Sequence, residues 1–183
     1  MLINNIFNHT KLVLKHKWYV LKFSIKLGIP LRGLLHDISK FSPTEFWESV
    51  KYYNGEKSPI TVSKQINGYS KAWLHHKGRN KHHIEYWVDN MAPEKTPIIP
   101  YKYVAEMICD KLSASIVYNG KKWTKSSQLE YWNKEKTKLQ INSHVEKMLS
   151  QVFEQIAEKG IEPVLTKSNI KNLYKKHCEN IKK

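Results

Sequence analysis

Cysteine is scarce in this sequence, and long apolar runs are absent. Cys109 and Cys178 are the only cysteines among 183 residues, and one possible pair cannot form the disulfide framework of a small secreted protein. The first 23 residues lack the uninterrupted apolar core of a signal peptide, and no segment approaches the roughly 18 apolar residues that span a bilayer. The scarcity of cysteine favours a reducing compartment, and the lack of long apolar runs argues against a membrane span. We therefore predict a cytoplasmic protein.

Acidic residues are also few. The chain has 16 Asp and Glu against 31 Lys and Arg, which gives a formal net charge of +15. A positive field of this size attracts polyanions such as nucleic acids, nucleotides or an anionic membrane surface. The lysines are spread along the chain rather than gathered in one block, so simple solubility is an alternative interpretation of the same excess.

Strand-like alternation and internal repeats are absent too, whereas apolar residues recur at helical spacing. The length suits one domain with a sizeable core, and no shift in composition marks a boundary. We therefore predict a single all-α domain over residues 1–183, with its core at about 10–160 and a basic helical extension at 161–183.

The expected helices are separated by glycine, proline and polar turns. We expect a long first helix over 6–27 and a second over 31–41. A third begins sharply, with Ser42 as N-cap, Pro43 in the first turn and Glu45 closing a capping box. Further helices are predicted over 69–76, 82–88, 101–117, 139–159 and 168–182, with a turn at 77–80, a loop at 54–68 and an irregular segment at 91–100.

Histidines and aspartates form the most informative pattern. They occur in the order His16, His36-Asp37, His75-His76, His82-His83 and Asp110. Imidazole and carboxylate groups bind Zn, Fe, Mn, Ni and related divalent ions, and one ion needs three or four of them. This set is large enough for two ions bridged by one carboxylate, and facing helices of a bundle commonly supply such ligands.

The pair His36-Asp37 is the centre of this pattern. As neighbours on a helix, the two side chains are expected to project about 100° apart, so a cluster between these directions takes one ligand from each. The adjacent Leu34 and Leu35 are expected to be buried, which would place a charge in an apolar setting. An unpaired buried charge is costly, and a bound metal ion removes that cost.

With this pattern the chain resembles the HD-domain superfamily, all-α metal-dependent phosphohydrolases with the signature H…HD…D. The matching residues are His16, His36-Asp37 and Asp110. The additional histidines resemble the longer H…HD…H…HH…D pattern of two-metal members, which include the cyclic-dinucleotide phosphodiesterases. The Gly-Tyr-Pro motif of that branch is absent, so its substrate cannot be carried over. The stretches 73–87 and 103–110 look closer to small, largely uncharacterised HD-like proteins of bacteria and phages, a resemblance that covers about 10–160.

The resemblance implies a role for each residue. Asp37 would bridge two ions; His16, His36 and Asp110 would complete the ligands of one ion, and His76, His82 and His83 those of the other. We favour His76 over His75 as a ligand, although the sequence leaves both open. Lys40 would neutralise a phosphate oxygen, and Arg79 and Lys81 would bind further phosphates. His75, Glu85 and Glu106 would orient the ligating histidines, while ordinary surface ion pairs are an alternative for the glutamates. The sequence does not distinguish Fe, Mn, Ni, Zn and Mg.

The predicted function is hydrolysis of a phosphoester, and the predicted substrate is a nucleotide or an oligonucleotide. Aromatic residues near the proposed ligands would mostly be core, with one or two available to stack on a base; they are Trp73, Tyr86, Trp87, Tyr101 and Tyr103. The alternatives are a di-iron oxygenase on an HD-type scaffold, a basic protein that binds nucleic acid or nucleotide without catalysis, and a phage-type accessory protein that sequesters a nucleotide.

Overall fold

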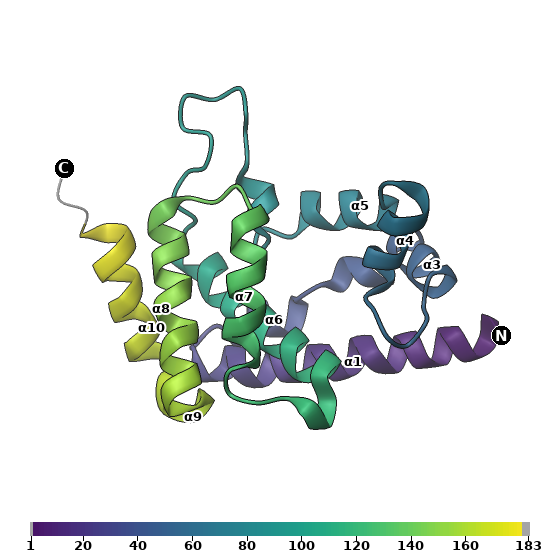
Figure 1. Cartoon of the computed structure of the whole chain (residues 1–183), viewed down its shortest axis with the longest axis horizontal. Helices are drawn as coiled ribbons and strands as arrows, with labels where there is room; N and C mark the ends of the chain where they lie inside the picture. The colour runs from purple at the N-terminus through teal and green to yellow at the C-terminus, as the bar shows by residue number, and fades with distance from the viewer. Residues whose placement is uncertain (1, 181–183) are drawn as a thin grey trace.

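Helix α6 (Tyr101–Asn119) is the central element of the computed structural model, which describes residues 2–180 (Figure 1). Over that range the chain is an all-α single domain without strands, as predicted. The other α-helices are α1 (Leu2–Lys26), α2 (Pro30–Leu35), α3 (Pro43–Lys51), α4 (Pro59–Asn67), α5 (Lys71–Arg79), α7 (Ser127–Glu135), α8 (Ser143–Lys159), α9 (Ile161–Val164) and α10 (Lys167–Tyr174). Short 3-10 turns η1 to η4 lie at Ile38–Phe41, Ile84–Trp87, Gly120–Lys122 and Lys136–Lys138, and the π-turn η5 at Lys175–Glu179.

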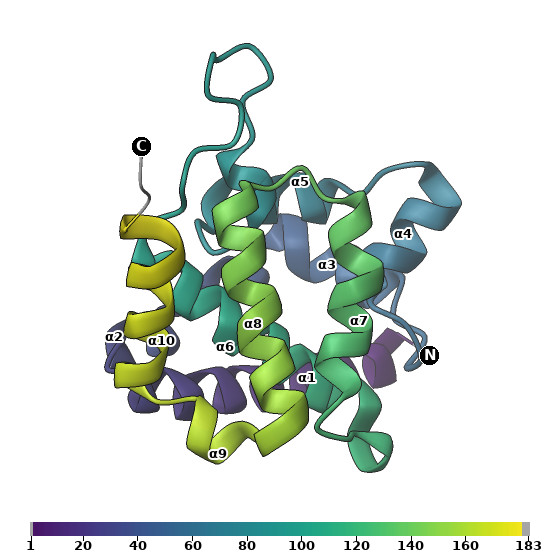
Figure 2. The same cartoon turned by 60° about the vertical axis from the view of Figure 1, so that its left-hand side comes forward.

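The apolar core lies between α6 and the helices around it. Helix α1 packs along α6 on one side, while α8 and α10 lie side by side next to it on the other (Figures 1 and 2). Apolar side chains recur along α8 at helical spacing, as the sequence predicts, and they are buried: Val145, Met148, Leu149, Val152, Phe153 and Ile156. These side chains belong to the same buried apolar cluster as those of α6, and their burial stabilises this half of the fold.

The C-terminal helices contribute to the same core. Ile170 and Leu173 on α10 are buried, and the buried Tyr174 hydroxyl donates to the Ile99 carbonyl at 3.0 Å. The helix predicted over 168–182 is α10 continued by η5, and its last two residues lie outside the described range. None of the helices in residues 2–180 combines the length and apolar character that a bilayer span requires.

Three predicted elements differ from the structure. The predicted loop at 54–68 contains α4, which starts with Pro59 in its first turn and ends at Gly68 in the left-handed conformation (φ 79°). The predicted turn at 77–80 lies largely inside α5, which continues to Arg79. The predicted helix over 82–88 is only the 3-10 turn η2, preceded by the extended residue His83.

The predicted helix over 31–41 is also wrong, with consequences for the site. Helix α2 ends at Leu35, His36 is extended, and Asp37 adopts the left-handed conformation (φ 52°, ψ 31°) before η1 begins. Leu34 and Leu35, expected to be buried, are 58% and 60% exposed. The break turns His36 and Asp37 into the protein instead, because a continuous helix could not direct both side chains inward while its leucines face outward.

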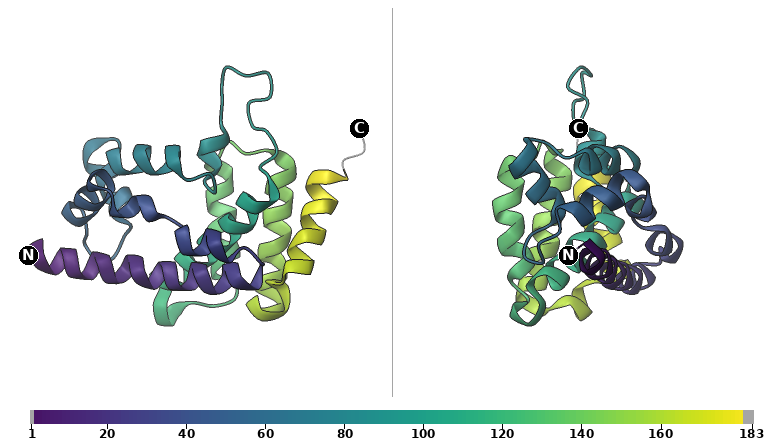
Figure 3. Two further views of the ribbon diagram at one scale, coloured as in Figure 1. Left: turned by 180° about the vertical axis from the view of Figure 1, so that it is seen from behind. Right: turned by 90° about the vertical axis from the view of Figure 1, so that its right-hand side faces the viewer.

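The place of α2 depends on a close contact with α1. Gly33 has no side chain, and a Cβ atom there would lie 2.5 Å from the Ser24 Cβ and 3.1 Å from the Leu21 Cα. This approach holds α2 flat against α1 in the view of Figure 3, left panel, and thereby positions the turn that follows it. A glycine is therefore needed at this position for packing.

We expect Gly33→Ala to lower the free energy of unfolding by about 1–3 kcal/mol, since the added methyl group forces the two helices apart. Gly78→Ala is the matched control. It lies within α5, where a Cβ meets no atom within 4 Å, so it should stabilise by up to about 1 kcal/mol through helix propensity. Urea denaturation measures both, and a Gly33→Ala variant as stable as the wild type would contradict the packing argument.

Candidate metal centre

The turn between α2 and η1 directs two side chains of types that can bind metal, His36 and Asp37, into the protein. Asp37 is the only non-glycine residue with positive φ among residues 2–180, and the residue is 2% exposed. The neighbouring residue His36 is 1% exposed. Backbone conformations of this kind cost about 1–3 kcal/mol and persist where the surroundings enforce them, often at functional sites.

Two groups of potential ligands meet at Asp37. In each group, the ligand atoms lie within 4.8 Å of one another. The first group comprises His16, His36, Asp37 and Asp110, and the second comprises Asp37, His76, His82 and His83. The structure thus brings together all seven residues that the sequence assigns to metal, from α1, α5, α6 and two connecting segments.

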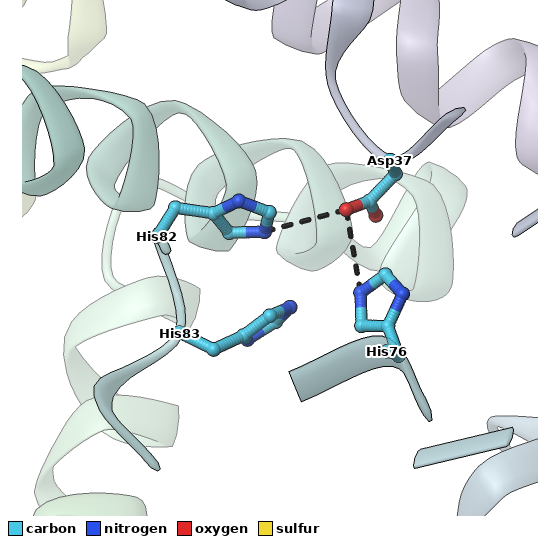
Figure 4. Close-up of side chains that lie close together, drawn as sticks. All are labelled: Asp37, His76, His82 and His83. Atoms are coloured by element: carbon cyan, nitrogen blue, oxygen red, sulfur yellow. Dashed lines mark ion pairs between the residues drawn. The ribbon is translucent and has the colours of Figure 1, made fainter. Parts of the chain in front are cut away.

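The two carboxylate oxygens of Asp37 face different groups. Oδ1 lies 3.3 Å from the His76 Nε2 and 3.4 Å from the His82 Nε2, while Oδ2 lies 3.3 Å from the His36 Nε2. Figure 4 shows the imidazoles of His76 and His82 directed at one oxygen, with the ring of His83 beside them. A carboxylate in this position is suited to bridge two cations.

The first group is completed from two helices. On α6, the Asp110 Oδ1 lies 3.0 Å from the Nε2 of His16, which comes from α1, and 3.4 Å from the His36 Nε2. The two Nε2 atoms are 3.4 Å apart. Because these atoms converge from separate elements, tertiary packing holds them in place.

Two buried glutamates orient the histidines from behind. The Glu106 Oε1 lies 3.0 Å from the His36 Nδ1 and 3.3 Å from the His82 Nδ1, so Nε2 of each ring faces Asp37. Glu106 is close enough to His36 and His82 to form a third possible group, but as the partner of their Nδ1 atoms it fits orientation better. Carboxylates commonly bind the second nitrogen of metal-ligating histidines. Arg32 in turn holds the Glu106 Oε2 through Nε at 2.7 Å.

Glu45 orients His76 of the second ligand group as Glu106 orients His36 and His82. The sequence analysis did not indicate this role for Glu45. Ser42 caps α3 as predicted, but the Glu45 side chain does not close a capping box. Its carboxylate is buried and lies 2.7 Å from the His76 Nδ1 and 2.6 Å from the His75 Nδ1. His75 therefore belongs to the layer around the ligands, whereas the His76 Nε2 faces Asp37.

Several buried polar atoms of the centre lack a hydrogen-bond partner among residues 2–180. They are the Asp37 Oδ1, the His82 Nε2 and the His83 Nε2. Buried polar groups nearly always have a partner, so such a cluster needs an explanation. Two imidazole nitrogens and a carboxylate oxygen are a suitable donor set for a divalent transition metal. The residues present therefore fit a metal ion.

The electrostatics keep the central carboxylates ionised. Burial by itself would raise the pKa of Asp37, but His36 and Lys40 hold it well below its usual range. Burial likewise opposes ionisation of Glu106, and hydrogen bonds from His36 and His82 lower its pKa to about 2. Metal ions bind deprotonated ligands, and the two carboxylates are in that form.

The residues predicted to bind phosphate lie in different places. The Lys40 Nζ is 2.6 Å from the Asp37 Oδ2 and lines the cavity above the centre. Arg79 and Lys81 are exposed and do not line that cavity. Glu85 lines it, but forms no hydrogen bond to a histidine among the described residues.

The cavity has a volume of about 580 Å³ and opens onto both ligand groups. Besides Lys40, its wall contains Lys57, Lys64 and Lys111, which the sequence did not single out. The Lys64 Nζ lies 4.6 Å from the centre of the Trp73 ring. Of the five aromatic residues expected near the site, only Trp73 lines the cavity; Tyr118 and Tyr131 do so as well. Tyr131 lies on α7, which the sequence analysis did not predict, and Tyr118 lies in the last turn of α6, beyond the end of the helix predicted there.

We expect the two glutamates to differ in their effect on metal binding. Glu106→Gln should weaken ions in both groups, because Glu106 contacts one histidine of each, whereas Glu45→Gln should weaken only the group with His76. Loss of such an orienting carboxylate typically costs about 10–100-fold in metal affinity. Calorimetric titration of chelator-treated protein with Mn²⁺ or Zn²⁺ measures this, with Glu130→Gln, on α7 outside the cavity wall, as control. Equal losses at both sites in Glu45→Gln would contradict the assignment.

Comparison with known proteins gives a family but no activity. No curated protein and no solved structure is significantly similar to the chain. Residues 5–159 match a family described only as "Family of unknown function (DUF5662)". The matched range includes every residue of the two ligand groups and the glutamates behind them. The chain belongs to this DUF5662 family of unknown function.

Proposed function

We propose that the protein is a metal-dependent phosphohydrolase that holds two divalent ions, bridged by Asp37, and acts on a nucleotide-like phosphoester. The observation that carries the proposal is the pair of His/Asp groups sharing Asp37 at a lysine-lined cavity. Bound there, two ions would polarise phosphoryl oxygens and lower the pKa of a water molecule, which supplies a nucleophile near neutral pH.

The ligand set supports this chemistry. Each group offers nitrogen and carboxylate donors, and Asp37 presents one oxygen to each. Two carboxylates do not neutralise two divalent cations, so the loaded centre keeps a positive charge that attracts an anionic substrate. Divalent transition-metal ions bind sites that combine imidazole nitrogens and carboxylate oxygens, and Fe, Mn, Ni and Zn all meet this requirement.

The protein's own residues would position the substrate. The Lys40 ammonium is fixed beside Asp37 and faces the cavity, where it can contact a phosphoryl oxygen and stabilise developing negative charge. Lys64, held over Trp73, and Lys57 lie farther along the wall and can bind additional phosphates. The cavity volume of about 580 Å³ is in the range of sites for nucleotide-sized ligands.

Replacement of the bridging carboxylate is the decisive test. We expect Asp37→Asn to lose at least one bound ion per chain and to lower kcat/KM on phosphoesters by about 100-fold or more. Asp89→Asn is the matched control, because Asp89 is exposed in the segment after η2. Elemental analysis and a phosphoester panel with Mn²⁺, Ni²⁺, Zn²⁺ and Fe²⁺ measure both effects.

The same samples distinguish the alternatives. Dioxygen consumption and an EPR signal in the iron-loaded protein, without phosphoester turnover under any metal, would favour a di-iron oxygenase. Metal binding without turnover of either kind, together with nucleotide affinity that survives Asp37→Asn, would favour a non-catalytic binding protein. Less than one bound ion per chain after reconstitution would contradict the metal site itself.

Cavity lysines should matter more than the exposed cations that the sequence indicated. We expect Lys64→Met to raise KM for a nucleotide about tenfold with little change in kcat, because a phosphate contact is lost in ground and transition states alike. Lys81→Met removes the same charge outside the cavity and should leave KM within about twofold. Steady-state kinetics measure both, and the reverse order would support the sequence-based assignment of Lys81.

A further inference from the structure

The outward face of α1 is apolar, although the helix lies at the surface. At about 100° per residue, five apolar side chains project within an arc of about 60°. They are Ile3, Phe7, Leu14, Trp18 and Ile25, and each is 54% to 80% exposed. The opposite side of the helix carries His9, His16 and Val20, which are buried.

Helix α2 extends this surface. Leu34 lies with Leu14 and Trp18 around a shallow groove of about 180 Å³ between the two helices. Leu31, Leu35 and Ile38 are also 60% or more exposed. We call the exposed apolar side chains of α1, α2 and η1 the α1–α2 face, and Figure 3 (left panel) shows the two helices side by side. Isolated exposed apolar residues are common, but a contiguous patch of this extent marks an interaction surface.

The segment that forms the α1–α2 face carries an excess of positive charge. Within residues 2–44, Asp37 is the only acidic residue, and it is buried. The basic residues of this segment are Lys11, Lys15, Lys17, Lys22, Lys26, Arg32 and Lys40. Lys17 donates to the carbonyl of His36, and Lys40 is paired with Asp37. Lys26 and Arg32 are paired with Glu162 and Glu106, outside this segment.

Three lysines are left to face outward. Lys11, Lys15 and Lys22 are exposed and form no ion pair within residues 2–180. By helical geometry they follow one edge of the apolar stripe, while α2 lies along the other edge. The surface thus combines an apolar centre, an exposed Trp and a cationic border.

From this combination we infer that the α1–α2 face docks on an anionic phospholipid bilayer, with α1 parallel to the membrane plane. Apolar side chains and Trp18 enter the boundary between headgroups and acyl chains, while the lysines contact anionic headgroups. A second copy of the chain fits less well, since pairing two α1 helices would bring lysines together without an acidic partner on either helix. The inference is independent of the metal centre.

Vesicle sedimentation tests the inference on the full chain. We expect binding to phosphatidylcholine vesicles that contain phosphatidylserine, little binding to pure phosphatidylcholine, and weaker binding as NaCl rises from about 0.1 M to about 0.5 M. Leu14→Ser combined with Trp18→Ser should reduce the partition coefficient at least tenfold. Ile66→Ser, a similarly exposed apolar residue on α4, is the control and should bind like the wild type.

A charge-matched pair of variants separates local from global electrostatics. Lys11→Glu, Lys15→Glu and Lys22→Glu together should reduce binding at least tenfold. Lys121→Glu, Lys122→Glu and Lys134→Glu make the same change in net charge at exposed positions on η3 and α7, and should reduce it less than threefold. Circular dichroism confirms folding of each variant.

Three results would overturn the inference. One is the absence of binding to anionic vesicles at low salt. Another is an equal loss of vesicle binding in the two triple variants, because net charge alone would then account for the binding. The third is a dimer that forms as the protein concentration rises, is detected by light scattering and is lost in the variant with Leu14→Ser and Trp18→Ser. If vesicles then bind neither the wild type nor this variant, the α1–α2 face joins two copies of the chain.

Discussion

The burial of the Asp37 carboxylate is the constraint on which the rest of the structure depends. A buried carboxylate is costly unless cations or hydrogen-bond donors compensate it. In this protein, Lys40 contacts one oxygen, and imidazole nitrogens from three different segments lie within 3.4 Å of the two oxygens. The left-handed backbone at Asp37 places the group there, and its cost has to be offset by what the carboxylate binds.

The surrounding helices are arranged to keep this centre rigid. Helix α6 supplies Asp110 to the first ligand group and Glu106, one turn earlier, as the carboxylate beside the Nδ1 atoms of two histidines. Arg32 from α2 fixes Glu106, and Glu45 from α3 fixes His76. Three of the proposed ligands, His36, His76 and His82, are therefore held from behind by a buried carboxylate on another helix. Such preorganisation is what a metal site needs, because loosely held ligands bind ions weakly and in varied geometries.

Helix α1 has two sides of different character. One side buries His16 in the first ligand group. The other side exposes the apolar side chains of the α1–α2 face. Lys17 lies between these two sides and donates to the carbonyl of His36, just before Asp37. Helix α1 therefore links the candidate metal centre to the exposed α1–α2 face on the other side of the helix.

The sequence by itself determined the helical class and the seven proposed ligands. Helical spacing of apolar residues is a local property, and the types His and Asp carry their chemistry wherever they lie. Only the tertiary structure decided that Asp37 sits in a left-handed turn, that Glu45 turns inward to His75 and His76, and that the leucines of α2 face outward. These outcomes depend on contacts between segments far apart in the chain. Local propensity cannot decide whether the Glu45 carboxylate bonds the backbone in a capping box or a distant histidine, because each offers that carboxylate a hydrogen-bond donor.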